Sequence, residues 1–109
     1  MAITRKSNII SIQDSETTLL EAESAEDCVV VSLILGNIDS EDATVTLHLT
    51  KSGEASVNIV TDLEVKEGEA VEFFIGGKGS LFLEPGDKLS ATASGADDIA
   101  ATLSWLSEV

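Results

Sequence analysis

The feature that most constrains this chain is a regular alternation of apolar and polar residues with a period of two. It is clearest in the segment "ATVTLHLTK" at residues 43–51, where Val45, Leu47 and Leu49 alternate with polar side chains. A period of two places successive side chains on opposite faces of an extended strand. We therefore expect these three residues to face a core, with His48 and its neighbouring threonines facing outward.

Similar segments recur along the chain, and turn-forming residues separate them at roughly ten-residue spacing. The predicted strands cover residues 8–13, 17–22, 27–37, 43–51, 55–65, 88–94 and 99–109, with two further short strands between 67 and 87. A helix over Ser15–Glu26 is the alternative for the second segment, but its apolar residues are too few for a helical stripe. The count of eight or nine short strands predicts an all-β fold, an antiparallel β-sandwich of jelly-roll-like type.

Length and charge limit the organisation and the partners of the chain. With 109 residues, we expect a single β-sandwich domain at 17–109, preceded at 1–16 by an N-terminal arm or edge strand. Six Lys and Arg against twenty Asp and Glu give a net charge of −14, which disfavours nucleic-acid and anionic membrane partners. We recognise no secretory signal and no membrane span, so we expect a soluble protein made in a cytoplasm.

The residue types that usually carry chemistry are sparse. Cys28 is the single cysteine, so no intramolecular disulfide can form, and its apolar surroundings predict a buried, inert thiol. The single histidine, His48, is expected in solvent, and "GGKG" at 76–79 lacks the spacing of a phosphate loop. The acidic clusters at 39–42 and 97–98 could bind calcium, but neither has EF-hand spacing, and solvated turn carboxylates are the simpler interpretation. We expect no catalytic residue, no cofactor and no metal site.

The turn in "LFLEPGDKLSATAS", residues 81–94, has a specific predicted geometry. Pro85 and Gly86 suit the two central positions of a type II turn, the second of which requires a positive φ. Asp87 is then expected to accept a hydrogen bond from a neighbouring backbone amide. Leu89, Ala91 and Ala93 are expected to face the core in the strand that follows.

Apolar residues on the apparently outward side of the strands are the main candidates for a binding surface. For the third segment the alternation predicts Val29, Val31, Leu33 and Leu35 facing the core, and for the fifth segment it predicts Val57 and Ile59 facing inward. The candidate interface residues are Ile3, Ile9, Val30, Ile34, Phe74, Phe82 and Leu106. Contiguous exposed apolar patches tend to be interfaces. The alternative is that bulges or loops place these residues inside the fold.

The chain from Thr17 to Val109 resembles small β-sandwich structural proteins of tailed-bacteriophage virions. The resemblance lies in an Asn near the end of a long strand, a Leu-rich strand, a "-GD-L-" corner, an Ala/Ser strand and a final strand with a Ser-Leu-Glu-like ending. The matching positions are Asn37, Leu83, Gly86, Asp87, Leu89, Ala91, Ser104 and Glu108. The ending "SWLSEV" departs from the commoner aromatic-Leu-Glu form.

The resemblance implies a non-enzymatic virion protein that is assembled in the host cytoplasm. The most direct expectation is a capsid decoration or cement protein that binds the major capsid protein. It would form a homo-oligomer, with a trimer favoured. Its contact surface would consist of residues 1–13 and the candidate interface residues. A neck or tail component, such as a ring or fibre-base module, is the alternative. A carbohydrate-binding or cell-surface module is a more distant one, because it would be expected to carry a secretion signal and an aromatic platform.

Overall fold

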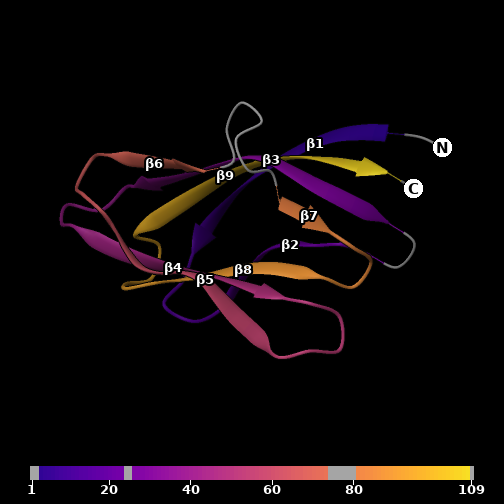
Figure 1. The fold of residues 1–109 in the computed structure, drawn as a ribbon. Helices are drawn as coiled ribbons and strands as arrows, with labels where there is room; N and C mark the ends of the chain where they lie inside the picture. The colour runs from indigo at the N-terminus through magenta and orange to yellow at the C-terminus, as the bar shows by residue number, and fades with distance from the viewer. Residues whose placement is uncertain (1–2, 24–25, 74–80, 109) are drawn as a thin grey trace.

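The computed structural model describes residues 3–23, 26–73 and 81–108, and in them the predicted all-β sandwich is confirmed. Nine strands form two antiparallel sheets (Figure 1). Their bounds are β1 Ile3–Ile12, β2 Thr17–Glu21, β3 Asp27–Asn37, β4 Ala43–Thr50, β5 Ser56–Val65, β6 Ala70–Phe73, β7 Leu81–Leu83, β8 Lys88–Ala93 and β9 Ile99–Glu108. The segment with the helical alternative is a strand, β2.

The strands pair in a nested order. Sheet A has the order β1-β9-β3-β6, with β7 also paired to β3, and sheet B has the order β2-β8-β4-β5. Thus β1 pairs with β9, β2 with β8, β3 with β6 and β7, and β4 with β5, as if one long hairpin had been rolled into two layers. This pairing, with β6 and β7 sharing one strand position, is the order of a jelly roll.

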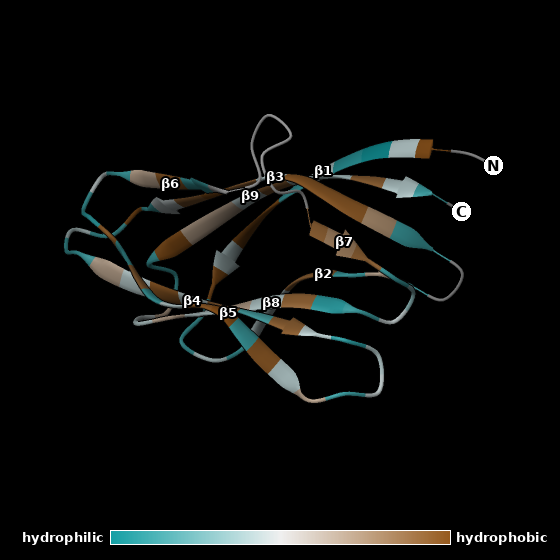
Figure 2. Ribbon diagram, viewed as in Figure 1, coloured by the Kyte–Doolittle hydropathy of each residue, from teal (hydrophilic) through white to brown (hydrophobic). Residues whose placement is uncertain are grey.

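The core lies between the inner faces of the two sheets. Figure 2 shows hydrophobic residues along β3, β7 and β9. The alternation predicted for β4, β8 and β9 places Leu47, Leu89 and Leu103 inside, as expected. Burial of this apolar surface is the main force that holds the layers together. The buried apolar residues are Ile12, Leu19, Leu20, Ala22, Cys28, Val30, Leu33, Leu35, Ala43, Val45, Leu47, Val65, Leu83, Leu89, Ala91, Ala93, Ile99, Ala101 and Leu103.

The predicted orientation of the first half of β3 is wrong. Val30 is fully buried, whereas Val29 and Val31 are only partly buried. The pairing of β3 with β9 shifts register between Val30 and Ser32, so Val31 is an extra residue that reverses the alternation at this point. Val30 therefore belongs to the core, and the predicted role of Val30 as an interface residue is corrected.

In β5, Val57 lies on the predicted inward side, because it pairs with Leu49, whereas Ile59 is an extra residue at a register shift and departs from the predicted alternation. Both side chains are exposed, at 63% and 39% respectively. The pairing of β5 with β4 shifts register twice, around Ile59 and again before Leu63, and Asp62 in the second irregularity has φ 49°. The extra residue breaks the period of two at Ile59, whereas Val57 is exposed because β5 lies at the edge of sheet B.

The turn between β7 and β8 has the predicted geometry and also a contact that joins the two sheets. Gly86 has φ 90°, and a Cβ there would lie 2.6 Å from Ser52 Oγ, so a larger residue is excluded both by conformation and by space. The Asp87 carboxylate accepts hydrogen bonds from the Glu84 and Ser52 backbone amides, each at 2.9 Å. It also accepts one from Lys51 Nζ at 2.5 Å. Asp87 therefore ties the β7–β8 turn to the β4–β5 hairpin.

Candidate functional site

The outer faces of the two sheets differ in chemistry. Residues directly paired across an antiparallel ladder share a face, so the register assigns each strand residue to the core or to the outside. On sheet B, every outward residue with a paired partner is polar: Thr18, Glu21, Thr44, Thr46, His48, Thr50, Ser56, Asn58, Glu64, Lys88, Ser90 and Thr92. The outer face of sheet B is therefore a polar surface rich in threonine.

The outer face of sheet A instead carries large apolar residues. Leu106 pairs with Val29, which pairs in turn with Phe82, so a row of apolar side chains crosses β9, β3 and β7. We define the sheet A face as the outward residues of this sheet. They are Ile3, Arg5, Ser7, Ile9, Ser11, Asp27, Val29, Ser32, Ile34, Gly36, Ala70, Glu72, Phe82, Ala100, Thr102, Ser104, Leu106 and Glu108, together with the bulged Val31.

Five of the seven predicted interface residues lie on the sheet A face. Ile3, Ile9 and Phe82 are 65%, 71% and 52% exposed, and Ile34 and Leu106 are partly buried. Of the other two, Val30 is in the core, and Phe74 lies outside the described residues. The structure thus gathers the predicted residues from four strands on one face.

Val29 and Val31 also belong to this face, although the alternation predicted them inside. Val29 pairs with Leu106 and Phe82, and Val31 lines a hollow on the same face. Only the position of the bulge could have corrected the prediction, and a run of three valines gives no local signal for it, because each valine suits either face of a strand.

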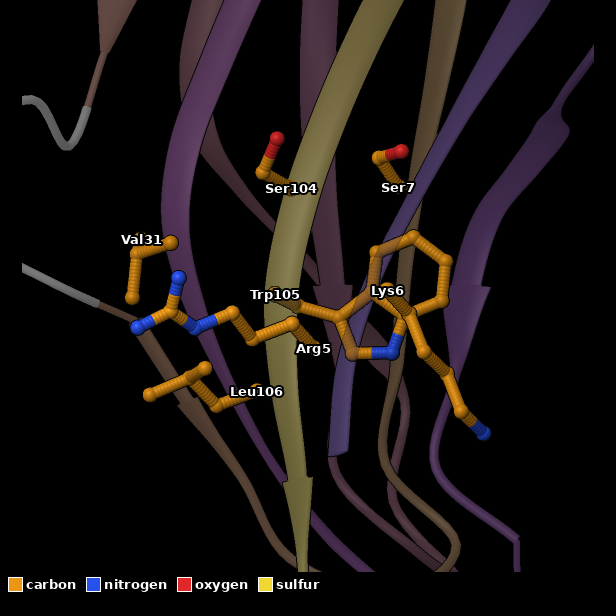
Figure 3. Close-up of a pocket in the computed structure, with 7 residues that line it drawn as sticks. All are labelled: Arg5, Lys6, Ser7, Val31, Ser104, Trp105 and Leu106. Carbon is orange, nitrogen blue, oxygen red and sulfur yellow. The ribbon is translucent and has the colours of Figure 1, made fainter. Parts of the chain in front are cut away.

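An open hollow of about 470 Å³ lies on the sheet A face, where β1, β9 and β3 run side by side. The Arg5 side chain extends across β9 toward Val31 and Leu106, while Ser7 and Ser104 lie at the other end of the hollow (Figure 3). Lys6 and Trp105 complete the lining. The hollow therefore combines apolar walls with a guanidinium, an arrangement that fits an apolar group next to an anion.

A hydrogen-bonded cluster closes the end of sheet A near residues 26–28. Glu26 accepts hydrogen bonds from Ser107 Oγ and from the Cys28 thiol, the latter at 3.6 Å, and forms an ion pair with Lys6 at 3.5 Å. The hydrogen bond from Ser107 is the main reason that the pKa of Glu26 lies below its usual value. The cluster anchors the exposed strand β1, through Lys6, to the beginning of β3.

The Cys28 thiol is expected to be unreactive in the folded protein. Its side chain is fully buried, and burial, with the nearby Glu26 carboxylate, raises its pKa to about 11. Since the thiolate is the reactive form, we expect a disulfide-exchange reagent at pH 8 to label the native protein at least about a hundredfold more slowly than the urea-unfolded protein. Comparable rates in the two states would show that Cys28 is accessible.

His48 takes part in a polar network on the outer face of sheet B. Its ring nitrogens lie 2.7 Å from Asn58 Oδ1 and 3.0 Å from Thr92 Oγ1, so the ring bridges β5 and β8 across β4. Nearby, Ser90 Oγ donates to Glu16 Oε2 at 2.7 Å. The predicted solvated histidine is instead partly buried and held on both sides by hydrogen bonds.

The described residues offer neither a metal site nor a membrane-spanning helix, within the ranges 3–23, 26–73 and 81–108. No group of three or more His, Cys, Asp or Glu side chains among these residues is arranged to hold a metal ion. In the same part of the chain, no helix is long and apolar enough to cross a membrane. Comparisons with protein-family models, with curated proteins and with solved structures gave no match.

Proposed function

We propose that this protein is a non-enzymatic structural component of a tailed-bacteriophage virion, and that it decorates the capsid by binding the major capsid lattice through the sheet A face. The observation that carries the proposal is the contrast between the two outer faces. One is polar throughout its paired residues, and the other collects apolar side chains from β1, β3, β7 and β9. A contiguous apolar patch on a small protein is the usual mark of an interaction surface.

The fold and the charge support this assignment without being specific to it. Jelly rolls occur in viral capsid proteins, and also in lectins and in cupins, so the architecture alone does not determine function. The net charge of −14 would keep free copies apart in solution until a specific surface is met. Covering a large apolar side chain completely contributes about 1.5–3 kcal/mol, and many copies bound to one shell would multiply a modest affinity for each site.

The proposed orientation places the sheet A face against the shell and the threonine-rich face of sheet B toward solvent. The apolar row Leu106–Val29–Phe82 would lie against the capsid surface, with Arg5 beside it to pair with a carboxylate of the shell. Glu21, Glu64 and the other acids of sheet B would then remain solvated.

Binding to capsids tests the proposal directly. Purified protein is mixed with expanded, DNA-free capsids of the phage whose genome encodes the chain, and bound protein is measured after sedimentation. We expect Phe82→Asp, on the exposed side of β7, to raise the dissociation constant by about tenfold or more. The matched control, Thr50→Asp on the outer face of sheet B, adds the same charge and should bind as the wild type does.

The possible outcomes separate the candidate functions. Absence of binding to shells, with binding to isolated necks or tails, would replace decoration by the neck or tail alternative. Absence of binding to every virion component would remove the proposal entirely. If Phe82→Asp and Thr50→Asp lost the same amount of affinity for capsids, then added negative charge, and not the sheet A face, would control binding.

A further inference from the structure

The hollow on the sheet A face contains a row of small side chains. Ser7 pairs with Ser104, and Ser104 pairs with Ser32, so three serines lie side by side across β1, β9 and β3. Larger side chains flank this row on the same face, because residues two positions apart along a strand point the same way. The flanking rows are Arg5–Leu106–Val29 on one side and Ile9–Thr102–Ile34 on the other. The serine row is therefore lower than the rows beside it.

Arg5 differs in its ion pairing from the other cations among the described residues. Four lysines form ion pairs with carboxylates, and they are Lys6, Lys51, Lys66 and Lys88. Arg5 is the remaining described cation, and no described carboxylate lies within ion-pair distance of it, although the chain has twenty Asp and Glu. The one described cation without an acidic partner is thus the one in the hollow.

The acids nearest to Arg5 in the ladder do not pair with it. Glu108 and Asp27 pair with each other in the next row of the same face, and neither forms an ion pair with Arg5. The guanidinium lies instead between the side chains of Val31 and Leu106 (Figure 3). A guanidinium is weakly hydrated and packs well against apolar groups. Beside such groups its hydrogen bonds to a carboxylate are stronger than they would be in open water.

The shape and charge of the hollow indicate the chemistry of its occupant. A volume of about 470 Å³ is that of a small-ligand pocket, so two neighbouring side chains have room in it. The hollow is open and lies on a sheet face, whereas sites for free small molecules enclose most of the ligand. It therefore suits side chains that project from another protein. A nucleic-acid phosphate is disfavoured as the anion by the net charge of −14.

We propose that the hollow recognises one acidic residue and an adjacent large apolar residue on a projecting segment of the capsid protein. This inference rests on the proposed function and identifies the part of the partner that the sheet A face selects. The Arg5 guanidinium donates two hydrogen bonds to the carboxylate, and the apolar side chain packs against Val31 and Leu106. Arg5 is then the residue that determines specificity, because an uncharged segment would leave it without an acidic partner.

Variants of Arg5 test this assignment in the capsid-binding assay. We expect Arg5→Gln to raise the dissociation constant by about tenfold or more. Arg5→Lys keeps the charge but lacks the planar fork, so it should fall between Arg5→Gln and the wild type. The matched control is Lys88→Gln on the outer face of sheet B, which removes the same charge and should bind within about twofold of the wild type. Circular dichroism establishes that each variant is folded.

A second measurement needs no capsid. Arg5 is the only arginine of the chain, so its Nε–H group gives a unique signal in a ¹H–¹⁵N NMR spectrum. The probe is the blocked dipeptide N-acetyl-Leu-Asp amide, and its uncharged control is N-acetyl-Leu-Asn amide. We expect the acidic peptide to shift the Arg5 signal and the amides of Val31 and Ser104, with saturation in roughly the millimolar range. The Asn peptide should leave the Arg5 signal unchanged.

The outcomes separate this inference from the proposed function. If Arg5→Gln binds capsids as the wild type does while Phe82→Asp loses binding, the inference is overturned and capsid decoration stands. If the wild type binds no capsid but the acidic peptide still shifts the Arg5 signal, the capsid partner is wrong, and another acidic protein is the occupant. Equal responses to the two peptides, or no response to either, would show that Arg5 does not select a carboxylate.

Discussion

Replacing Asp87 by alanine is expected to lower the free energy of unfolding by about 3 kcal/mol. The carboxylate is 3% exposed and accepts hydrogen bonds from Lys51 Nζ and from the backbone amides of Ser52 and Glu84. Its removal leaves two backbone donors without their acceptor and separates the β7–β8 turn from the β4–β5 hairpin. Urea unfolding followed by circular dichroism measures the change.

The matched control for this variant is Glu84→Gln. Glu84 is also an ion-pair partner of Lys51, at 3.4 Å, but its side chain is 63% exposed. An exposed ion pair contributes little, because solvent screens it. If Glu84→Gln lowered the free energy of unfolding as much as Asp87→Ala does, the effect would come from the charge of Lys51 and not from the buried carboxylate.

The same carboxylate predicts a pH dependence. Burial alone would raise the pKa of Asp87, but the hydrogen bonds from Lys51 and the two amides outweigh it and hold the pKa below the ordinary value of 3.8. A carboxyl whose pKa is lower in the folded state contributes stability above its unfolded pKa, and loses it as pH falls through the folded pKa. The difference in stability between the wild type and Asp87→Asn is therefore expected to be constant near neutral pH and to shrink below about pH 4.

Val30→Asp is expected to abolish folding at neutral pH, whereas Val31→Asp is expected to fold. Val30 is fully buried between the sheets, so an aspartate there is an unpaired charge in the core, at a cost of several kcal/mol. Val31 lies in the bulge on the sheet A face and lines the hollow that Arg5 also lines. Circular dichroism and thermal unfolding of the two variants give the comparison, and the opposite order of stability would place the bulge elsewhere.

The sequence predicts the regular strands well and the irregular ones poorly. In β4, β8 and β9 the alternation is uninterrupted, and Leu47, Leu89 and Leu103 are buried as their positions indicate. In β3 and β5 an added residue reverses the alternation partway along the strand. A bulge is determined by pairing with a neighbouring strand, and the local pattern contains no information on that neighbour.

The residues of the candidate surface were likewise predictable in the regular strands and not in the bulged ones. Ile9 and Phe82 lie on the side that the alternation predicts, because no irregularity interrupts the alternation around them. Which strands lie at the edges of the two sheets could not be predicted from the alternation. That information is in the order of the sheets, which comes from pairings between segments far apart in the sequence.

The nested pairing has a consequence for how the chain is made. β9 lies between β1 and β3 in sheet A, yet a ribosome completes the other eight strands before it. Until β9 is released, β1 has no partner in its own sheet, and β3 has only β6 and β7. Sheet A therefore cannot be completed before this strand is translated, and a nascent chain that stops before β9 would expose the unpaired edges of β1 and β3 to chaperones and to its own copies.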